Sequence, residues 1–469
     1  MKPSEIDLEI NRIIDVFAEK AKEYNLNTNN RKLFPTPEAI RNLSKFNIEL
    51  QDDPVNPEEV LQELDHIGSP ATVASTGSRY FGFVIGGALP AALGANLMAG
   101  VWDQNAGLEA TSPIASYLEV ICRRWLNSLL HLPPETEVGF VTGATMANFT
   151  ALAAARHSIL KKAGWNVESD GLYGAPEITV IVGDEVHVSV LKALSLLGFG
   201  RNRVIKVPCD NQGRMKASAF PRIKGPAIIC LQAGNVNTGA FDPIDEICDI
   251  AHKEGAWVHV DGAFGLWASL IPGKIKLIKG IEKADSWATD AHKWLNTPYD
   301  SGIAFVKDGQ SLNASMAQNA AYLIQNGRRD PYITVPEMSR RARGIEVWAA
   351  LRSLGRNGLT DMIRRNCDLA IIFADRLKDA GFAILNEVVL NQILVSFGDA
   401  ELTNRIISQI QDDGTCWCSG TTWQNHTAMR ISISSWRTTR EDVEKSADVI
   451  ITIAKEEIMK TVLQPEDRG

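Results

Sequence analysis

The lysine at residue 293 has an unusual neighbourhood for a basic side chain. The stretch 285–306 reads DSWATDAHKWLNTPYDSGIAFV, with short β-like runs on either side of His292, Lys293 and Trp294. Uncharged surroundings that partly desolvate an ammonium group lower its pKa and make the amine a better nucleophile. One reaction that needs such an amine is imine formation with an aldehyde. A single lysine of this kind is more often a surface residue after a strand, so the interpretation requires a partner group.

A carboxylate 32 residues earlier supplies that partner. The run 256–263, AWVHVDGA, is mostly apolar and predicts a buried parallel strand that ends at Asp261. In open α/β sheets, ligands bind outside the carboxyl ends of the strands, where Asp261 and Lys293 would both emerge. A carboxylate there can keep the pyridine nitrogen of pyridoxal 5'-phosphate (PLP) protonated, and the small Ala263 would let the flat ring lie close to the backbone. An aspartate at a strand end is often a helix cap, but its pairing with Lys293 favours a PLP site.

Four motifs follow one another along the chain: TGATMANFTALAAAR at 142–156, DEVHVS at 184–189, HVDGAFG at 259–265 and AHKW at 291–294. Together and in this order they resemble the group II PLP-dependent amino-acid decarboxylases, which include the glutamate, aromatic amino-acid, histidine and diaminobutyrate enzymes. The resemblance runs from about residue 80 to about residue 441. It implies an α/β fold of the fold-type I PLP-dependent transferase class and a homodimer with shared active sites. It also implies decarboxylation of an L-amino acid to an amine and CO2, with Lys293 holding PLP.

The phosphate of PLP is expected at the start of a helix. Gly143 precedes the helix-like run 144–156, and a helix N-terminus offers free N–H groups and the positive end of the helix dipole. Without the resemblance this would be only a capped helix after a glycine turn; with it, phosphate contacts fall on Ala144 and Thr145. The resemblance also places His187, which follows an apolar strand, against the face of the pyridine ring. A lone histidine there would more often be a core residue.

Four further residues match cofactor-contacting positions of the family. Asn235 corresponds to a position near the phenolic oxygen of PLP, where relatives often have threonine. Asp290 and His292 are expected near the phosphate, although some relatives carry asparagine at 290 and an acid facing a phosphate is electrostatically awkward. Ser339 would contact the phosphate across the subunit interface, where many relatives have glycine.

The resemblance implies that a mobile loop carries the proton donor. In the family, a tyrosine on this loop protonates the substrate Cα after CO2 has left. Tyr322 matches that position, in the context AYL, and Tyr332 is the fallback; a surface tyrosine without a role is the alternative. The loop is expected to close over the neighbouring subunit's site and to exclude water.

The substrate is the least determined part of this interpretation. Phe83, Val84, Ile85 and Trp102 are expected to line the substrate pocket, and their apolar character favours an aromatic or bulky side chain over glutamate. An aminotransferase on the same fold would clamp the substrate carboxylate with an arginine such as Arg430. An aldehyde synthase would lack the loop tyrosine, and a non-catalytic dimeric scaffold would not need the lysine, aspartate and histidine together.

Composition limits the other classes of function. The chain has 469 residues, 45% hydrophobic and 22% charged, with a net charge of −8, so it is expected to bind no nucleic acid. Seven cysteines, an odd number, predict free thiols in a reducing, cytoplasmic setting. Cys416 and Cys418 have one residue between them, which does not match zinc-ligand spacing, so no metal is expected. The N-terminus shows no signal peptide.

One uncharged stretch, 81–102, is long enough to mimic a membrane span, but its glycines and proline predict a buried loop and helix instead, with no membrane contact.

The chain is expected to divide into three parts. Residues 1–78 predict a helical segment, since its apolar residues fall at helical spacing. The resemblance implies that this segment packs on the partner subunit. Residues 79–345 predict the large PLP-binding domain, with strands and helices in alternation and a mainly parallel sheet. Residues 346–469 predict a smaller C-terminal α/β domain.

Overall fold

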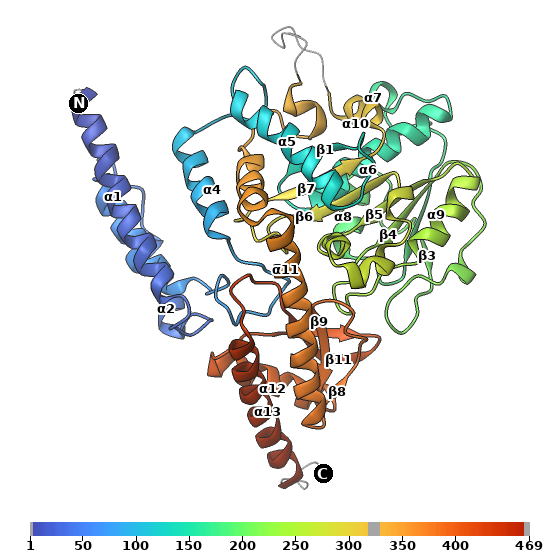
Figure 1. The fold of residues 1–469 in the computed structure, drawn as a ribbon. Coiled ribbons are helices and arrows are strands. Elements are labelled where there is room, and N and C mark those ends of the chain that lie inside the picture. Colours follow the sequence, from blue (N-terminus) through green and yellow to red (C-terminus); the bar gives the residue numbers. More distant parts are fainter. Residues whose placement is uncertain (1–2, 318–328, 464–469) are drawn as a thin grey trace.

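A mainly parallel sheet forms the centre of the protein (Figure 1). The computed structural model describes residues 3–317 and 329–463, and within them this sheet has seven strands in the order β1-β7-β6-β5-β4-β2-β3. The pairs among β2 to β6 are parallel, whereas β7 runs antiparallel to both β1 and β6. The predicted fold class is confirmed. The strands are β1 (Glu137–Val141), β2 (Thr179–Gly183), β3 (Ile205–Val207), β4 (Ala227–Gln232), β5 (Trp257–Asp261), β6 (Ser286–Asp290) and β7 (Gly302–Val306).

Both faces of this sheet are buried, which explains why its strands are almost continuously apolar. Side chains alternate between the two faces: Ile229 and Val258 point into one hydrophobic core, and Ile228 and Val180 point into another. Helices α5, α9 and α11 contribute to the first core, and α6, α8 and α10 to the second. These helices are α5 (Pro113–Leu129), α6 (Ala144–Lys162), α8 (Val188–Leu196), α9 (Ile244–Lys253), α10 (Gly309–Met316) and α11 (Arg343–Asp379).

A smaller antiparallel sheet, with strand order β10-β11-β9-β8, lies at the other end of α11 (Figure 1). It packs against the last helices around a hydrophobic core of its own. Helix α11 reaches both sheets and is interrupted at Gly355, whose φ of 59° is readily adopted only by glycine. The elements are β8 (Ala383–Ile384), β9 (Gln392–Ser396), α12 (Ala400–Asp413), β10 (Ser419–Trp423), β11 (His426–Ser432) and α13 (Arg440–Leu463).

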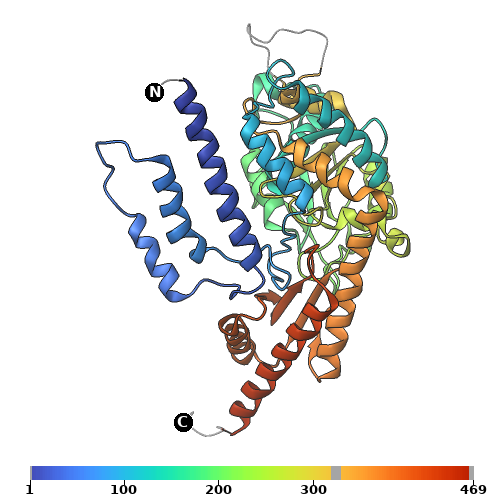
Figure 2. The ribbon, with the colours of Figure 1, turned by 60° about the vertical axis from the view of Figure 1, so that its left-hand side comes forward.

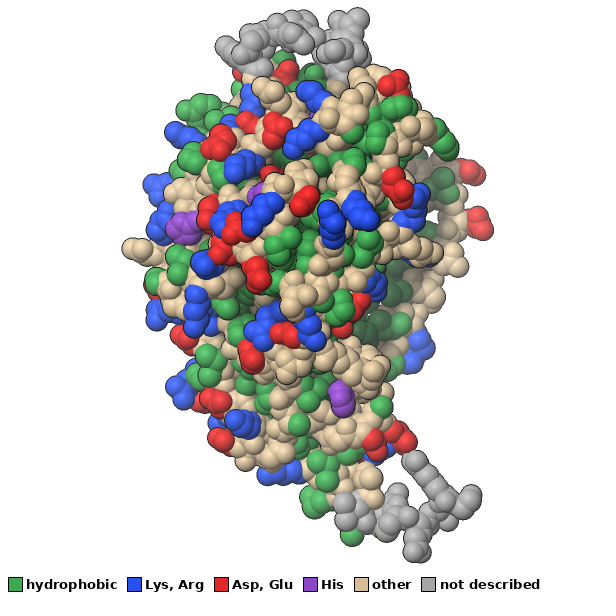
Figure 3. Space-filling view, turned by 90° about the vertical axis from the view of Figure 1, so that its right-hand side faces the viewer, with side chains coloured by type: hydrophobic (Ala, Val, Ile, Leu, Met, Phe, Trp, Pro, Cys, Tyr) green, Lys and Arg blue, Asp and Glu red, His purple; other side chains and the backbone are tan. Residues whose placement is uncertain are grey.

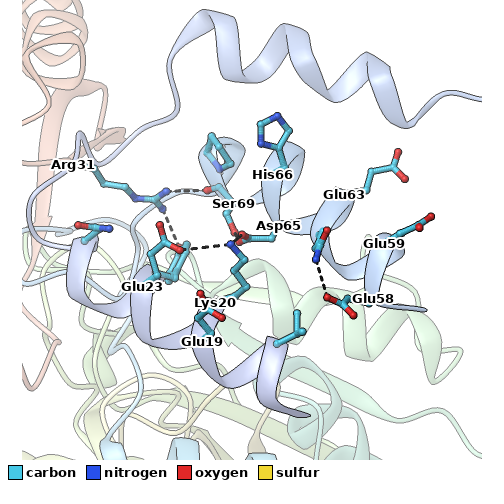
Figure 4. A pocket seen from close by; sticks show the side chains of 15 residues that line it. Glu19, Lys20, Glu23, Arg31, Glu58, Glu59, Glu63, Asp65, His66 and Ser69 are labelled. Atoms are coloured by element: carbon cyan, nitrogen blue, oxygen red, sulfur yellow. Dashed lines mark hydrogen bonds and ion pairs between the residues drawn. The ribbon is translucent and has the colours of Figure 1, made fainter. Parts of the chain in front are cut away.

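The N-terminal helices stand beside the main body (Figure 2). Figure 4 shows the pocket between them, where the Lys20 ammonium lies 3.4 Å from the Asp65 carboxylate and Arg31 donates to the Ser69 carbonyl at 2.9 Å. The expected apolar face of α1 includes Ile10 and Phe17, which are 53% and 43% exposed. The described residues of this chain therefore do not cover that face. The helices are α1 (Pro3–Asn27), α2 (Pro37–Asn42) and α3 (Pro57–Glu63).

The prediction for the uncharged stretch 81–102 is correct for its loop and wrong for its helix. Its loop is buried, with Phe81 and Val84 at most 1% exposed. Its helix, α4 (Pro90–Trp102), is not, because only one side packs on α11 while Leu97 and Val101 are 39% and 71% exposed on the other. The prediction of a buried helix is wrong. Among residues 3–317 and 329–463, no helix has both the length and the apolar character needed to cross a membrane.

The surface gives no sign of a nucleic-acid site on the face drawn in Figure 3. Acidic and basic side chains are interspersed there, without a large basic area among the side chains shown. All seven cysteines are free thiols, and Cys416 and Cys418 are fully buried. The described part of the chain holds no group of three or more His, Cys, Asp or Glu residues that could bind a metal ion.

Candidate active site

A small cavity lies at the carboxyl ends of β4 and β5. Its walls come from distant parts of the sequence: Asp261 ends β5, His187 directly precedes α8, and Lys293 follows β6 by three residues. The structure thus brings together the lysine, the aspartate and the histidine, as the motifs predicted. The lining residues are His187, Gln232, Gly234, Val236, Asp261, Ala263, Phe264 and Lys293.

Lys293 lies in the connection between the antiparallel strands β6 and β7. The connection is closed by its own backbone, because the N–H groups of Ala291 and His292 donate to the Ser301 carbonyl at 3.0 and 3.1 Å. The Lys293 Nζ lies 2.8 Å from Oδ2 of Asp290. A neighbouring loop passes so close that a Cβ atom at Gly86 would overlap the Lys293 carbonyl oxygen. The backbone of the lysine is therefore held from both sides.

Asp290 occupies the place where the phosphate was predicted. Its carboxylate is almost fully buried and accepts a hydrogen bond of 2.5 Å from the backbone N–H of Ala144, the first residue of α6. His292 Nε2 lies 3.5 Å from the same oxygen, and Thr145 follows in the first turn, partly exposed. The helix N-terminus and Lys293 explain how a buried acid is stabilised here. Ala144, His292 and Lys293 thus all converge on this carboxylate.

Asp261 is a buried carboxylate that opens onto the cavity without a cation beside it. It accepts hydrogen bonds from Asn148 Nδ2 at 3.2 Å, from Ser189 Oγ at 3.4 Å and from the backbone N–H of Ala263 at 3.2 Å. No Lys, Arg or His forms an ion pair with it among the described residues. A carboxylate with free acceptor capacity in a cavity fits a ligand that presents an N–H group, such as the protonated ring nitrogen of PLP.

His187 is the N-cap of α8 and presents its ring to the same cavity. Its Nδ1 accepts from the backbone N–H of Ser189 at 3.2 Å and lies 2.7 Å from the Ser189 hydroxyl. Burial is the main cause that lowers the pKa of His187, and the charges of Lys293 and Arg430 lower it further, although Asp261 acts in the opposite direction. A neutral imidazole of this kind can lie flat against an aromatic ring without the cost of burying a charge.

The remaining cofactor candidates lie outside the lining of this cavity. The Asn235 side chain is buried and accepts from the N–H groups of Asn237 and Thr238, so it caps the turn whose Gly234 and Val236 line the cavity. Ser339 is exposed before α11 and accepts from Asn105.

The two tyrosines proposed as proton donors differ in what the structure shows of them. Tyr322 lies outside the described residues. Tyr332 is 8% exposed in a 3-10 turn, Pro331–Thr334, and its backbone N–H donates to the Gly107 carbonyl at 3.0 Å. A side chain packed in this way is a poor candidate for a group that must reach a ligand.

The four residues expected to line the substrate pocket are not brought together. Val84 is fully buried in the core of the large sheet. Trp102 is 41% exposed at the end of α4, and Ile85 is partly buried. Phe83 is 57% exposed, with its ring 5.5 Å from that of Trp417. Phe83 and Val84 both have positive φ, of 52° and 59°, a strained conformation for such residues, beside the loop of Lys293.

Sequence reasoning missed two residues around this site, Asn148 and Tyr299, and named a third, Arg430, only for the aminotransferase alternative. Asn148, in α6, is fully buried and bonds to Asp261. Tyr299 stacks on His292 with ring centroids 4.2 Å apart. Arg430, in β11, is 9% exposed, donates to Asn237 Oδ1 at 3.4 Å and has no partner for its Nε among the described residues. The motif around Asn148 was visible in the sequence, but nothing local showed which way its side chain points.

Comparison with known proteins gives a consistent family. Residues 37–398 match the model of the pyridoxal-dependent decarboxylase conserved domain. The chain is 27% identical over 430 residues to an aromatic-L-amino-acid decarboxylase of Bacillus atrophaeus, which covers 85% of this chain and 84% of that protein. It is 30% identical over 369 residues to L-tyrosine/L-DOPA decarboxylase 2 of Lophophora williamsii, with coverage of 74% and 66%.

Two solved structures show the same fold. A structure described as Oryza sativa TDC with PLP and tryptamine superposes with a TM-score of 0.86, at 20% identity, over 97% of this chain and 99% of that one. Mouse CSAD gives the same values. The matched family model spans the lysine, the aspartate and the helix N-terminus of the cavity. The chain is therefore a PLP-dependent amino-acid carboxy-lyase and belongs to the pyridoxal-dependent decarboxylase family.

Proposed function

We propose that this decarboxylase acts on an L-amino acid with an aromatic or bulky side chain and that Lys293, Asp261 and His187 are its catalytic residues. The observation that carries the assignment of residues is the single cavity that all three line. When bound, PLP supplies an aromatic ring that can take up the electrons of the broken bond to CO2. The protein must hold that ring, keep its nitrogen protonated and exclude water.

Each of these tasks has a residue suited to it. The Lys293 amine would be the nucleophile that holds the cofactor covalently. The Asp261 carboxylate would accept the N–H of the ring nitrogen and stabilise its positive charge. His187, whose pKa is lowered mainly by burial, would offer a flat surface to the ring. The N-terminus of α6, at Ala144 and Thr145, and the side chain of His292 would hold the phosphate.

An aromatic cluster around the loop that passes the backbone of Lys293 supports the proposed substrate class. Tyr80 and Trp417 stack with ring centroids 5.0 Å apart, and Phe83 packs on the same indole. These residues belong to the loop that presses on the backbone of Lys293 and to its packing partner. Apolar surface of this kind stabilises a bound apolar side chain by about 25 cal/mol per Å² buried. Measurement of CO2 release from the twenty amino acids and diaminobutyrate tests the proposal, and fastest release from glutamate or aspartate would contradict it.

Arg430 is the residue that an aminotransferase of this fold would use for the substrate carboxylate. It is nine-tenths buried, its Nε has no partner among the described residues, and its charge lowers the pKa of His187. The same assay separates the two reactions, because transfer of the amino group yields a 2-oxo acid and no CO2. An aldehyde synthase would release CO2 but yield an aldehyde instead of an amine.

Replacing Asp290 by asparagine is expected to tighten PLP binding by about tenfold, or about 1.4 kcal/mol. The carboxylate and the phosphate compete for the N-terminus of α6, and two anions at one site repel each other. Asparagine keeps the shape of the side chain without its charge. Equilibrium dialysis of PLP against both proteins measures the change. Weaker binding by the variant would mean that the Asp290 carboxyl group itself holds the cofactor.

Replacing Tyr322 by phenylalanine is expected to lower the yield of amine per CO2 released. If the Tyr322 hydroxyl gives the proton to the substrate Cα, its loss does not prevent binding or release of CO2 but leaves that carbon without its proton donor. Oxygen or protonation at the wrong carbon then diverts the product to carbonyl compounds. Parallel measurement of amine and CO2 gives the ratio, and a ratio that stays at one to one would exclude Tyr322 as the donor.

We further propose that the protein is a homodimer in which residues 1–78 pack on the partner subunit. Exposed apolar side chains gather on two facing elements, α1 and α4, and a groove between them is lined mostly by apolar atoms. Isolated exposed apolar residues are normal in a monomer, but two facing apolar helices mark an interface. A second copy of the chain is the occupant we propose, and Ser339 would then reach the phosphate of the neighbouring site.

Replacing Leu97 by aspartate is expected to convert the dimer to a monomer. The side chain lies on the exposed face of α4 and lines the groove, so a charge there would be buried on association. Ile275→Asp is the matched control, since Ile275 is also exposed, at 50%, but lies outside that groove. Sedimentation velocity distinguishes the two states. A monomeric unmodified protein, or an unchanged dimer in Leu97→Asp, would contradict the proposal.

A further inference from the structure

Five buried side chains form a continuous chain of hydrogen bonds that ends on Asp261. The indole Nε1 of Trp257 lies 2.8 Å from Ser286 Oγ, which lies 2.9 Å from His259 Nδ1. On the other side of the imidazole, His259 Nε2 lies 2.9 Å from Asn148 Oδ1, and Asn148 Nδ2 lies 3.2 Å from Asp261 Oδ2. All five residues are at most 5% exposed. This series of hydrogen bonds connects the interior of the sheet to the cavity.

The direction of every hydrogen bond in this chain follows from chemistry. An indole N–H can only donate, so the Ser286 oxygen accepts it and gives its own proton to His259 Nδ1. An ionised carboxylate can only accept, so Asn148 turns its NH2 group to Asp261 and its oxygen to the imidazole. The imidazole must therefore carry its proton on Nε2. Every donor in the chain points toward Asp261.

His259 can maintain this arrangement because it does not change charge. Burial lowers its pKa to about 3, so the ring is neutral at any pH at which the enzyme is expected to work. Both ring nitrogens have a partner, which fixes the tautomer. A histidine whose only role was to fill the core would not need a link to the cavity.

We infer that Asn148 and His259 are positioning residues that fix the orientation of the Asp261 carboxylate toward the ring nitrogen of PLP. The inference rests on the contact proposed above between Asp261 and that nitrogen. The Ala263 N–H holds Oδ1, and Asn148 with Ser189 holds Oδ2, so rotation of the carboxylate breaks several bonds at once. His259 in turn holds the amide of Asn148 in the orientation that donates. Aligned hydrogen bonds strengthen one another in a low-dielectric interior.

Two substitutions of His259 separate this role from core packing. Glutamine can place an amide N–H where the imidazole has Nε2, so His259→Gln keeps the bond to Asn148. Asparagine is shorter and reaches only the position of Nδ1, so His259→Asn keeps the contact with Ser286 and loses the one to Asn148. Both variants lose the same imidazole. Asn148→Ala removes the donor to Asp261 directly, and Asn127→Ala, a buried asparagine that bonds to the Thr136 carbonyl, is its control.

The readouts are the PLP dissociation constant, from equilibrium dialysis, and the 15N signal of the ring nitrogen in 15N-labelled PLP bound to the protein. We expect Asn148→Ala and His259→Asn to weaken PLP binding by about tenfold, the scale of one lost hydrogen bond to a charged group. We also expect both to shift the nitrogen signal toward the unprotonated form. His259→Gln and Asn127→Ala should retain binding and signal close to those of the unmodified protein.

Two results would overturn the inference. One is thermal destabilisation of the Asn148 and His259 variants with unchanged binding and an unchanged ring-nitrogen signal. The other needs no variant: 15N spectra of the unmodified protein that place the His259 proton on Nδ1. Asp261→Asn distinguishes this failure from that of the proposed function. If that variant leaves the ring-nitrogen signal unchanged, the contact between Asp261 and the cofactor is itself wrong; if it shifts the signal while the others do not, only the positioning role fails.

Discussion

Replacing Lys293 by alanine is expected to abolish turnover, with a loss of roughly a thousandfold or more, and to yield a folded protein that no longer attaches PLP covalently. Among the described residues, Lys293 is the lysine that lines the cavity. Its removal leaves the Asp290 carboxylate with the N-terminus of α6 and His292 as partners, so the fold should persist. The absorbance of the bound cofactor and borohydride trapping, followed by peptide mass spectrometry, measure the loss.

A lysine elsewhere on the surface provides the control for this experiment. Lys192→Ala, on α8 and exposed, removes the same side chain without touching the cavity. It should retain both the absorbance and the trapped peptide. A cofactor trapped on another lysine in Lys293→Ala would show that the nucleophile had been wrongly chosen. Absence of bound PLP in the unmodified protein would contradict the assignment of this cavity as the cofactor site.

Replacing Asp261 by asparagine is expected to lower turnover by roughly a hundredfold while much of the PLP stays bound. A neutral amide no longer stabilises the positive charge on the ring nitrogen. The variant also meets a local conflict, because an amide NH2 group at the Oδ2 position would face the NH2 group of Asn148. Steady-state rates and the ratio of bound PLP to protein give the two quantities.

Asp242→Asn is the matched control, since Asp242 is also a buried aspartate. Its carboxylate accepts from the N–H groups of Met215 and Gln232 and lies outside the cavity lining, and burial raises its pKa to about 6. It should alter stability and leave the rate per folded protein near normal. Near-normal turnover in Asp261→Asn would refute the role of that carboxylate.

The sequence predicted the parts of the site that depend on strands. Asp261 was predicted because an apolar run of strand length ends there, and Lys293 because a second run ends just before it; parallel strands place both ends at one edge of the sheet. Helix α6, which is proposed to bind the phosphate, was predicted in the same way, from a glycine followed by a helical run. Each of these signals is local, and the order of the four motifs along the chain indicated that they belong to one site.

The parts that were not predicted depend on contacts between distant residues. The bond between Asn148 and His259 joins positions 111 residues apart, and no periodicity in either segment shows it. Val84 was expected in the substrate pocket, whereas the structure buries its side chain in the core of the large sheet. The exposure of α4 was missed for a related reason. An apolar sequence indicates that a surface will be buried, but it does not indicate whether the same chain or another chain buries it.

The position of β1 has a consequence for how the protein is made. This strand is hydrogen-bonded at the edge of the sheet to β7, with Glu137 opposite Val306. During synthesis, β1 therefore cannot pair until the ribosome has made the residues between the two strands and β7 itself. At about 5–20 residues per second this takes roughly 10–30 s. During that time an apolar strand remains without its partner, in a nascent chain that already carries α6. Chaperone dependence of synthesis should therefore concentrate in this interval and end once β7 has emerged.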